Sequence, residues 1–167
     1  MKRFPLVPLL ALVTLVVDQF TKWLVVATLP LDQPTYPIPA LSWLFGFTHV
    51  TNTGVAFGLF KEAGPIFVFV AIVVITILLY SMRSLPAEQG LVRIALGLQL
   101  GGAFGNLVDR LRLGYVVDFI DFKFWPIFNV ADSSIVIGVL LLAFSMWRES
   151  RAKPAASTQE PGERLPG

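Results

Sequence analysis

The sequence contains no cysteine and a single histidine, His49, among its 167 residues. Without cysteine the chain has no disulfide bond, no thiol nucleophile and no cysteine-based zinc site, and its redox compartment stays undetermined. One histidine excludes the two-histidine zinc motif of metalloproteases and leaves no obvious Ser–His arrangement for nucleophilic catalysis. We expect His49 to lie in a strand, either at the surface or hydrogen-bonded.

Charged residues are also scarce. They make up 14% of the chain, whereas hydrophobic residues make up 55%, and the mean hydropathy is +0.72. A chain of this size cannot hide so much apolar surface inside one small water-soluble core, so the sequence predicts an integral membrane protein. The formal net charge of +2 does not indicate nucleic-acid binding, because the basic residues form no continuous patch.

Four apolar stretches are long enough to cross a bilayer, whose hydrocarbon core needs about 20 helical residues. They cover residues 4–29, 65–82, 91–108 and 131–147. The first stretch follows two basic residues, as in a secretory signal peptide, but it continues past Asp18 and Lys22 and is too long for one. We therefore predict a mainly α-helical membrane protein, a bundle of four transmembrane helices that forms one domain over residues 1–152. Residues 153–167 have the composition of a disordered tail.

The basic residues predict how the spans are oriented. The side that carries both termini has eight Lys and Arg residues, namely Lys2, Arg3, Arg83, Arg93, Arg148, Arg151, Lys153 and Arg164. The opposite side has four, namely Lys61, Arg110, Arg112 and Lys123. By the positive-inside rule the termini are cytoplasmic, and residues 30–64 and 110–130 face outward.

Both outward segments have the pattern of β-strands. Residues 47–52 alternate between apolar and polar side chains, and residues 115–122 are rich in aromatic and β-branched side chains. Aromatic residues such as Trp43 and Trp125 suit the headgroup zone of a membrane. The sequence therefore predicts a small extracytoplasmic β-like cradle at the outer membrane surface.

Polar residues within the spans indicate a functional site, because a charge inside a bilayer is costly. Asp18 and Lys22 are four residues apart and share a helix face. We interpret them first as a structural ion pair, with a catalytic role as the alternative. Asn106, Asp109 and Arg110 share another face, on which Arg110 has the chemistry to bind either Asp109 or a lipid phosphate.

Two further patterns favour packing over chemistry. Gly97, Gly101 and Gly105 recur at every fourth position, which lets a neighbouring helix approach closely. Ser133 and Ser134 stand at the start of the fourth span, where we expect them to cap the helix.

The strongest chemical pattern is a pair of acids, Asp118 and Asp132, on either side of a short aromatic loop at the outer rim. Two carboxylates held close together share a proton, so that one acts as a base toward water and the other as an acid toward a carbonyl oxygen. This is the chemistry of an aspartic protease. Because Asp132 begins a helix, whose dipole favours the ionised form, we assign it as the base and Asp118 as the acid.

Taken alone, such a pair is weak support for catalysis, since structural acids are common, and two other classes of protein stay open. A proton-coupled transporter would also bury Asp18, Lys22 and Asp109, although the sequence shows no internal repeat. A non-catalytic membrane adaptor would explain the glycine pattern but not the costly acids.

Five motifs give the chain a specific resemblance. They are Asp18-Gln19-x-Thr21-Lys22, Asn52-Thr53-Gly54-Val55-Ala56-Phe57, Gly105-Asn106-Leu107-Val108-Asp109-Arg110, Val116-Val117-Asp118-Phe119 and Phe128-Asn129-Val130-Ala131-Asp132-Ser133. In this order they resemble lipoprotein signal peptidase, also called signal peptidase II, a family of bacterial inner-membrane aspartic proteases. The resemblance covers residues 4–147.

The resemblance implies an enzyme that cuts the signal peptide from prolipoproteins immediately before a cysteine that carries a diacylglyceryl group. Asp118 and Asp132 would form the catalytic dyad. The positions that would support or line the site are Asp18, Lys22, Asn52, Gly54, Asn106, Asp109, Arg110, Asn129 and Ala131. The resemblance implies no metal and no organic cofactor, an active site on the periplasmic side of the inner membrane, and inhibition by the cyclic peptide globomycin. We expect a monomer surrounded by phospholipid.

Two mechanistic details stay open. Asn52, Asn106 and Asn129 each have an amide that can donate a hydrogen bond to a developing oxyanion, and the sequence does not choose among them. The apolar segment 57–60 has the composition of a lid that closes over a bound signal peptide.

Overall fold

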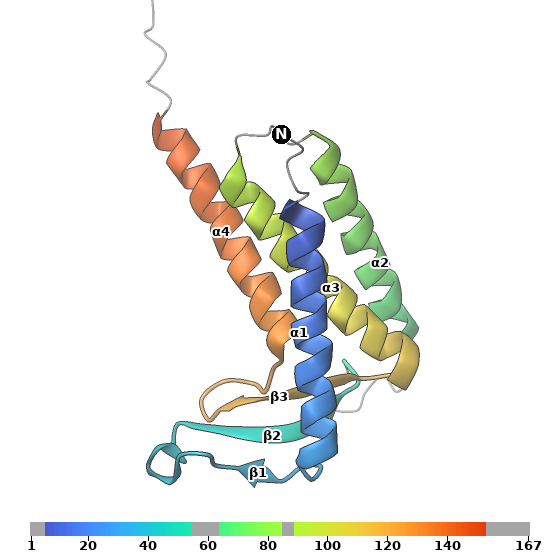
Figure 1. Ribbon diagram of the computed structural model, residues 1–167, viewed down its shortest axis with the longest axis vertical. Helices are drawn as coiled ribbons and strands as arrows, with labels where there is room; N and C mark the ends of the chain where they lie inside the picture. Colours follow the sequence, from blue (N-terminus) through green and yellow to red (C-terminus); the bar gives the residue numbers. More distant parts are fainter. Residues whose placement is uncertain (1–5, 55–63, 85–88, 153–167) are drawn as a thin grey trace, which may run out of the picture.

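A computed structural model describes residues 6–54, 64–84 and 89–152. In these residues four helices stand side by side, and a small antiparallel sheet lies across one end of the bundle (Figure 1). The helices are α1 (Leu6–Thr28), α2 (Gly64–Ser81), α3 (Gly90–Leu113) and α4 (Val130–Ala152). The strands are β1 (Pro34–Thr35), β2 (Phe45–Asn52) and β3 (Val116–Phe122). The predicted architecture, mainly helical with a small β cradle, is confirmed.

The number of membrane spans is confirmed only in part. Among the described helices, α1, α3 and α4 are long and apolar enough to cross a bilayer. The predicted span over residues 65–82 corresponds to α2, a shorter apolar helix that gives way to a 3-10 turn at Met82–Ser84. The structure therefore shows three candidate spans.

α3 is longer than the predicted 91–108 span and continues to Leu113. Gly114 then adopts a left-handed conformation (φ 82°), and its N–H donates to the carbonyl oxygen of Arg110 at 3.1 Å, which closes the helix. Asp109 and Arg110 consequently belong to the helix, in agreement with the face that they were predicted to share with Asn106.

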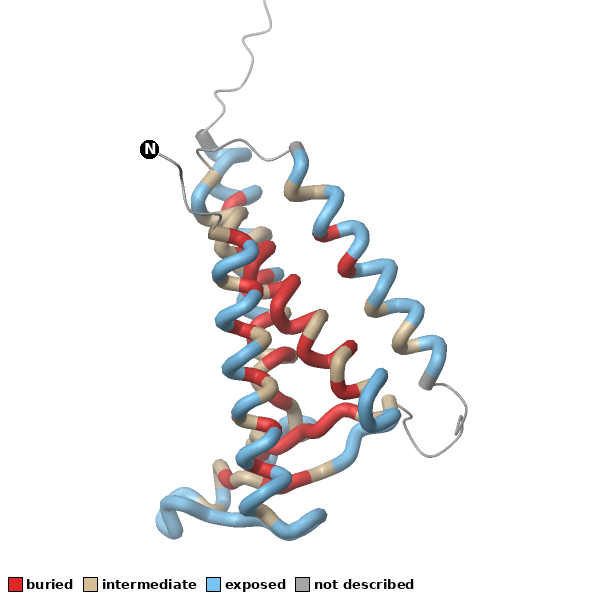
Figure 2. Tube along the Cα trace, turned by 45° about the vertical axis from the view of Figure 1, so that its right-hand side comes forward, coloured by how far each residue is buried: buried red, intermediate tan, exposed pale blue. Residues whose placement is uncertain are grey.

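α3 lies at the centre of the bundle. In its most apolar window 61% of the residues are buried, against 28% in α1 and 17% in α4. Buried residues form a band through the middle of the bundle that continues down to the sheet, whereas the outer faces of the helices are exposed (Figure 2). The exposed faces are apolar, as expected of helices in contact with lipid.

The glycine pattern serves close packing, as predicted. A Cβ at Gly97 would lie 2.8 Å from Cβ of Leu10, and one at Gly101 would lie 2.6 Å from the carbonyl oxygen of Ala11. A Cβ at Gly105 would meet the carboxylate of Asp18. α1 can therefore approach α3 so closely only because these side chains are missing.

The sheet confirms both predicted strand segments. β2 pairs with β1 on one side and with β3 on the other, so the two segments expected to face outward meet in one sheet. Val117 and Phe119 of β3 pack with Val25 of α1 in a buried cluster. Asp118 lies between them in the sequence and points to the opposite face, because side chains alternate along a strand. His49 is buried in β2, and its Nδ1 lies 3.2 Å from the carbonyl oxygen of Leu29.

Candidate active site

Asp118 is a buried carboxyl held by two amides. It is 1% exposed. Its Oδ2 accepts a hydrogen bond from Asn52 Nδ2 at 2.8 Å, and its Oδ1 accepts one from Asn129 Nδ2 at 2.6 Å. Burial, with the neighbouring charge of Asp132 adding to it, raises the pKa of Asp118 to about 6 despite the hydrogen bonds. This carboxyl therefore holds a proton more readily than an ordinary aspartate.

Asp132 lies in the first turn of α4 and takes part in a reciprocal cap of that helix. Its backbone N–H donates to Asn129 Oδ1 at 2.9 Å, while its own Oδ2 accepts from the backbone N–H of Asn129 at 3.3 Å. This arrangement is a capping box, with Asn129 as the N-cap. The prediction that Ser133 and Ser134 cap the helix is wrong, because their hydroxyls donate to the carbonyl oxygens of Asn129 and Val130 instead.

Two asparagines link the acids. Asn129 is fully buried, and its Nδ2 donates to Asp118 and to Asn106 Oδ1, the latter at 3.2 Å. Asn106 Nδ2 in turn donates to Asp132 Oδ1 at 2.7 Å. Asp118 from β3 and Asp132 from α4 thus belong to one hydrogen-bonded network whose other members come from β2, α3 and the start of α4.

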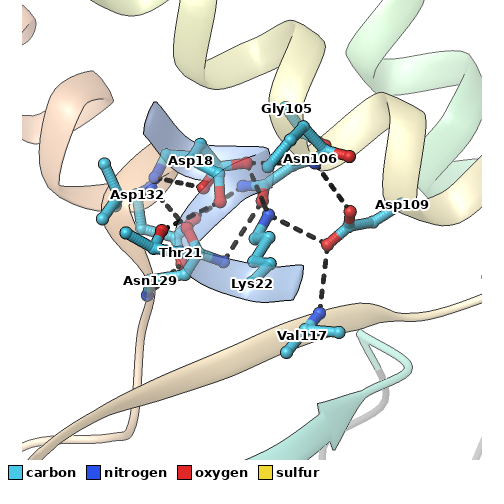
Figure 3. Close-up of polar contacts among 12 residues, drawn as sticks. Asp18, Thr21, Lys22, Gly105, Asn106, Asp109, Val117, Asn129 and Asp132 are labelled. Carbon is cyan, nitrogen blue, oxygen red and sulfur yellow. Dashed lines mark hydrogen bonds and ion pairs between the residues drawn. The ribbon is translucent and has the colours of Figure 1, made fainter. Parts of the chain in front are cut away.

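Behind this network lies a buried lysine with three partners (Figure 3). Lys22 Nζ lies 2.9 Å from Asp18 Oδ2 and 2.9 Å from Asp109 Oδ2, and it donates to Asn106 Oδ1 at 3.0 Å. An ammonium group has three N–H donors, so these contacts use all of them. Because Lys22 binds the oxygen of Asn106, the amide NH2 of Asn106 is left facing Asp132.

The two acids around Lys22 also bind backbone groups of other elements. Asp18 Oδ1 accepts from the backbone N–H of Ala131 at 2.9 Å, and Asp109 Oδ2 accepts from that of Val117 at 3.1 Å. The first of these contacts satisfies an N–H at the start of α4 that has no partner within its own helix. The Asp18–Lys22 ion pair expected from the sequence is present. Through Asp18 this ion pair holds the start of α4 in place, and through the contact of Lys22 with Asp109 it also holds β3 in place.

Gln19 is a member of this group that the sequence-based predictions missed. Its Nε2 donates to Asp109 Oδ1 at 2.9 Å, and it lies 3.2 Å from both Asp18 Oδ2 and the carbonyl oxygen of Gly105. The only sequence signal was its place beside Asp18 in the first motif. Neighbouring residues point in different directions on a helix, so helical periodicity did not include it.

Gly54 and Asn52 form a turn at the edge of the site. Gly54 has φ of 78°, and its N–H donates to Asn52 Oδ1 at 2.8 Å, which leaves the NH2 of Asn52 directed at Asp118. A side chain at Gly54 would be strained in this conformation, and its Cβ would lie 2.5 Å from the ring of Phe67. The segment 57–60, predicted as a lid, lies outside the described residues.

Arg110 stands beside the network. Its Nη1 donates to the carbonyl oxygen of Asn106 at 3.4 Å, and its guanidinium lies 5.5 Å from the centre of the Phe67 ring. Among the described residues Arg110 forms no ion pair with Asp109, which pairs with Lys22 instead. The structure thus brings Asp118, Asp132 and the nine other positions of the predicted site into one region of the fold.

Comparison with known proteins decides the family. A family model described as signal peptidase (SPase) II matches residues 10–148. The chain belongs to the signal peptidase II family. It is 45% identical to the lipoprotein signal peptidase of Moorella thermoacetica over 138 residues, which are 83% of this chain and 90% of that protein. It is 48% identical to the lipoprotein signal peptidase of Caldanaerobacter subterraneus over 130 residues, which are 77% of this chain and 87% of that protein.

Solved structures agree with this family assignment. A bacterial membrane enzyme solved by the in meso method at 2.3 Å resolution matches with a TM-score of 0.76 and 29% identity, over 94% of this chain and 93% of that one. Another, at 1.9 Å resolution, matches with a TM-score of 0.77 and 31% identity, over 84% and 92%. The resemblance inferred from the five motifs is therefore confirmed. Membership in the signal peptidase II family supports removal of a signal peptide from prolipoproteins, and it identifies a bacterial membrane protein.

Proposed function

We propose that this member of the signal peptidase II family is an aspartic endopeptidase that cleaves diacylglyceryl-modified prolipoproteins just before the lipidated cysteine. Asp118 and Asp132 are its catalytic dyad. The observation that carries the proposal is their joint hydrogen bonding: the two carboxyls are linked through Asn129 and Asn106, and the charge of Asp132 contributes to the raised pKa of Asp118. One proton shared by two acids is the state that an aspartic protease requires.

The two acids take different roles in the proposed reaction. Asp132 is the base, since its carboxylate accepts two N–H groups and stands at the positive end of α4. It removes a proton from a water molecule, whose oxygen bonds to the scissile carbonyl carbon. Asp118 donates its proton to the carbonyl oxygen, which gives a neutral tetrahedral diol. The C–N bond then breaks as Asp132 passes its proton to the leaving amine and Asp118 takes a proton back from a diol hydroxyl.

Among the three candidate asparagines, accessibility supports Asn52 as the donor to the substrate. Asn129 is 0% exposed and Asn106 is 8% exposed, and both amides are engaged with the acids. Asn52 is exposed at the end of β2 and donates to Asp118. We therefore propose that the Asn52 amide also donates to the scissile carbonyl oxygen and stabilises the negative charge that develops there before the proton of Asp118 has fully transferred. Asn52→Ala should lower kcat with little change in KM, and an unchanged kcat would contradict this role.

We further propose that α2 is the fourth membrane span, with cytoplasmic termini and the dyad on the periplasmic side. In support of this, α2 runs beside α3, and the described chain begins and ends at the end of the bundle opposite the sheet (Figure 1). Because the chain has no cysteine, single-cysteine variants report topology directly. A membrane-impermeant maleimide should label Ser42→Cys in intact cells and label Ser150→Cys only after permeabilisation. The reverse result would invert the orientation.

The dyad is tested by cleavage of a diacylglyceryl-modified prolipoprotein peptide by the purified protein in detergent. Asp118→Asn and Asp132→Asn should each lower kcat by about 10³-fold or more, as loss of an essential catalytic group does in other proteases. Asp121→Asn is the matched control, since Asp121 lies on the same strand and pairs with Lys123 and Thr48. We expect it to stay active. Cleavage that survives either dyad substitution would contradict the assignment of the dyad. A folded wild type without activity would contradict the proposed function.

A further inference from the structure

A groove of about 270 Å³ runs beside the first turns of α4. It is lined by Trp125, Phe128, Asp132, Ser133, Val136 and Ile137. The first two of these residues belong to the connection between β3 and α4, and the other four lie on the helix itself. The groove therefore reaches the carboxyl that we assign as the catalytic base.

Apart from Asp132 the groove is an apolar surface. Ser133 is its other polar lining residue, and the Ser133 hydroxyl donates to the carbonyl oxygen of Asn129 at 2.9 Å within the helix. Trp125 and Val136 are 63% and 56% exposed, so the walls are open to an occupant. The groove thus has one ionisable group at its polar end and hydrocarbon elsewhere.

The groove is continuous with the lipid-facing side of α4. Val136, Leu140 and Phe144 follow Asp132 at intervals of four, so they share one face of the helix. All three are more than half exposed. Twelve residues of helix correspond to about 18 Å along its axis. An apolar track of this length leads from Asp132 into the region that the membrane-spanning part of α4 occupies.

We propose that this groove and track bind one acyl chain of the substrate's diacylglyceryl group. The inference rests on the proposed function, which supplies a substrate with acyl chains next to the scissile bond. One turn of a signal-peptide helix, about 10 Å across and about 5.4 Å long, occupies roughly 400 Å³, so the groove is too small to hold it. An extended peptide would leave its backbone N–H and C=O groups unpaired against apolar walls. An acyl chain has neither problem.

The groove positions the substrate more than it strengthens binding. A chain that moves from lipid into an apolar groove leaves one hydrocarbon environment for another, so the hydrophobic effect contributes little. Its benefit is orientation: a chain held along α4 fixes the attached cysteine relative to Asp132. Misplacement of a reacting group by about 1 Å can cost about 10²-fold in rate.

The test is photo-crosslinking with the full-length chain carrying Asp118→Asn, so that the substrate is not consumed. The probe is a diacylglyceryl prolipoprotein peptide with a diazirine in one acyl chain, and mass spectrometry locates the adducts. We expect adducts on α4 near Val136 or on Trp125. A further Val136→Trp substitution, which fills the groove, should reduce them about fivefold or more. Val139→Trp, on a half-exposed residue of α4 that does not line the groove, should not.

Activity supplies the second measurement. In the otherwise native chain, Val136→Trp should lower kcat/KM for a dipalmitoylglyceryl peptide about tenfold, whereas Val139→Trp should stay close to wild type. Three results would each overturn the acyl-chain site. The first is a set of adducts confined to other helices. The second is equal labelling of the groove by a diazirine phospholipid that the substrate does not displace, and the third is full activity of Val136→Trp. In all three cases the wild type still cleaves, which separates this failure from failure of the proposed function.

Discussion

Asp118→Asn should make the protein more stable at neutral pH while it abolishes cleavage. Asp118 is 1% exposed, and its burial, together with the charge of Asp132, raises its pKa from 3.8 to about 6. This rise in the pKa of Asp118 corresponds to about 3 kcal/mol of unfavourable interaction with the ionised carboxylate. The proposed catalytic acid is therefore held in the fold at a cost to stability.

The direction of this stability change with pH follows from proton linkage. Because the folded state binds this proton more tightly than the unfolded state, the stabilisation is fully present below the unfolded pKa and is lost as the pH rises through about 6. At neutral pH an uncharged asparagine avoids the cost of about 3 kcal/mol. Its NH2 group, however, faces one of the two amide donors, from Asn52 or Asn129, and the lost hydrogen bond costs about 1–2 kcal/mol. We expect a net gain of about 1–2 kcal/mol.

The assay is reversible unfolding of the purified proteins in detergent, followed by tryptophan fluorescence. The advantage of Asp118→Asn should shrink by about 2 kcal/mol between about pH 7.5 and about pH 4.5, because the wild-type carboxyl becomes protonated. Asp121→Asn is the control, and its effect on the unfolding free energy at neutral pH should have the opposite sign. Burial raises the pKa of Asp121, but hydrogen bonds from Lys123 and Thr48 outweigh it and lower that pKa overall. A less stable Asp118→Asn at neutral pH, or a difference that does not change with pH, would refute the reasoning.

Three shorter predictions address other parts of the site. Lys22→Met leaves two buried carboxylates without their cation, so it should lower the unfolding free energy by about 3–5 kcal/mol in the same assay; a loss below about 1 kcal/mol would show that these acids are not ionised. Gly105→Ala pushes a methyl group against Asp18 and should cost about 1–3 kcal/mol, whereas Gly90→Ala, with open space around it, should be nearly neutral. If Asp118 acts in its protonated form, as proposed, kcat/KM should fall as the pH rises above about 6. A profile that instead rises through this range would contradict the assignment of acid and base to the two aspartates.

Local patterns in the sequence predicted much of this protein. Runs of apolar residues predicted three candidate spans correctly, because a membrane helix needs a continuous apolar stretch and little else. Period-2 alternation predicted β2, and aromatic and β-branched residues predicted β3. The recurring glycines predicted that another helix packs closely against α3, and the structure shows that this helix is α1. The ordered motifs predicted the family, since several short motifs together are far more specific than any one of them.

Other features were wrong or incomplete because they depend on partners far away in the sequence. The serines after Asp132 were expected to cap α4, yet Asn129 and Asp132 cap it together, a local pattern of residues three apart that the prediction overlooked. Asp18 adds a further acceptor from α1. The Asp18 contact joins residues 113 positions apart, which no local rule can anticipate. Gln19 was missed for the same reason, since two of its three partners, Asp109 and the carbonyl oxygen of Gly105, lie on α3.

The sequence by itself determined which residues are available for chemistry: a few acids, amides and one lysine placed in or beside apolar stretches, whose cost in a membrane marks them as functional. Only the tertiary structure decided how they are used. Helix packing brings Lys22 against Asn106, which orients that amide toward Asp132, and the sheet carries Asp118 to Asn129. Hydrogen bonds are directional and short, so these pairings arise only when α1, α3, α4 and β3 have packed together.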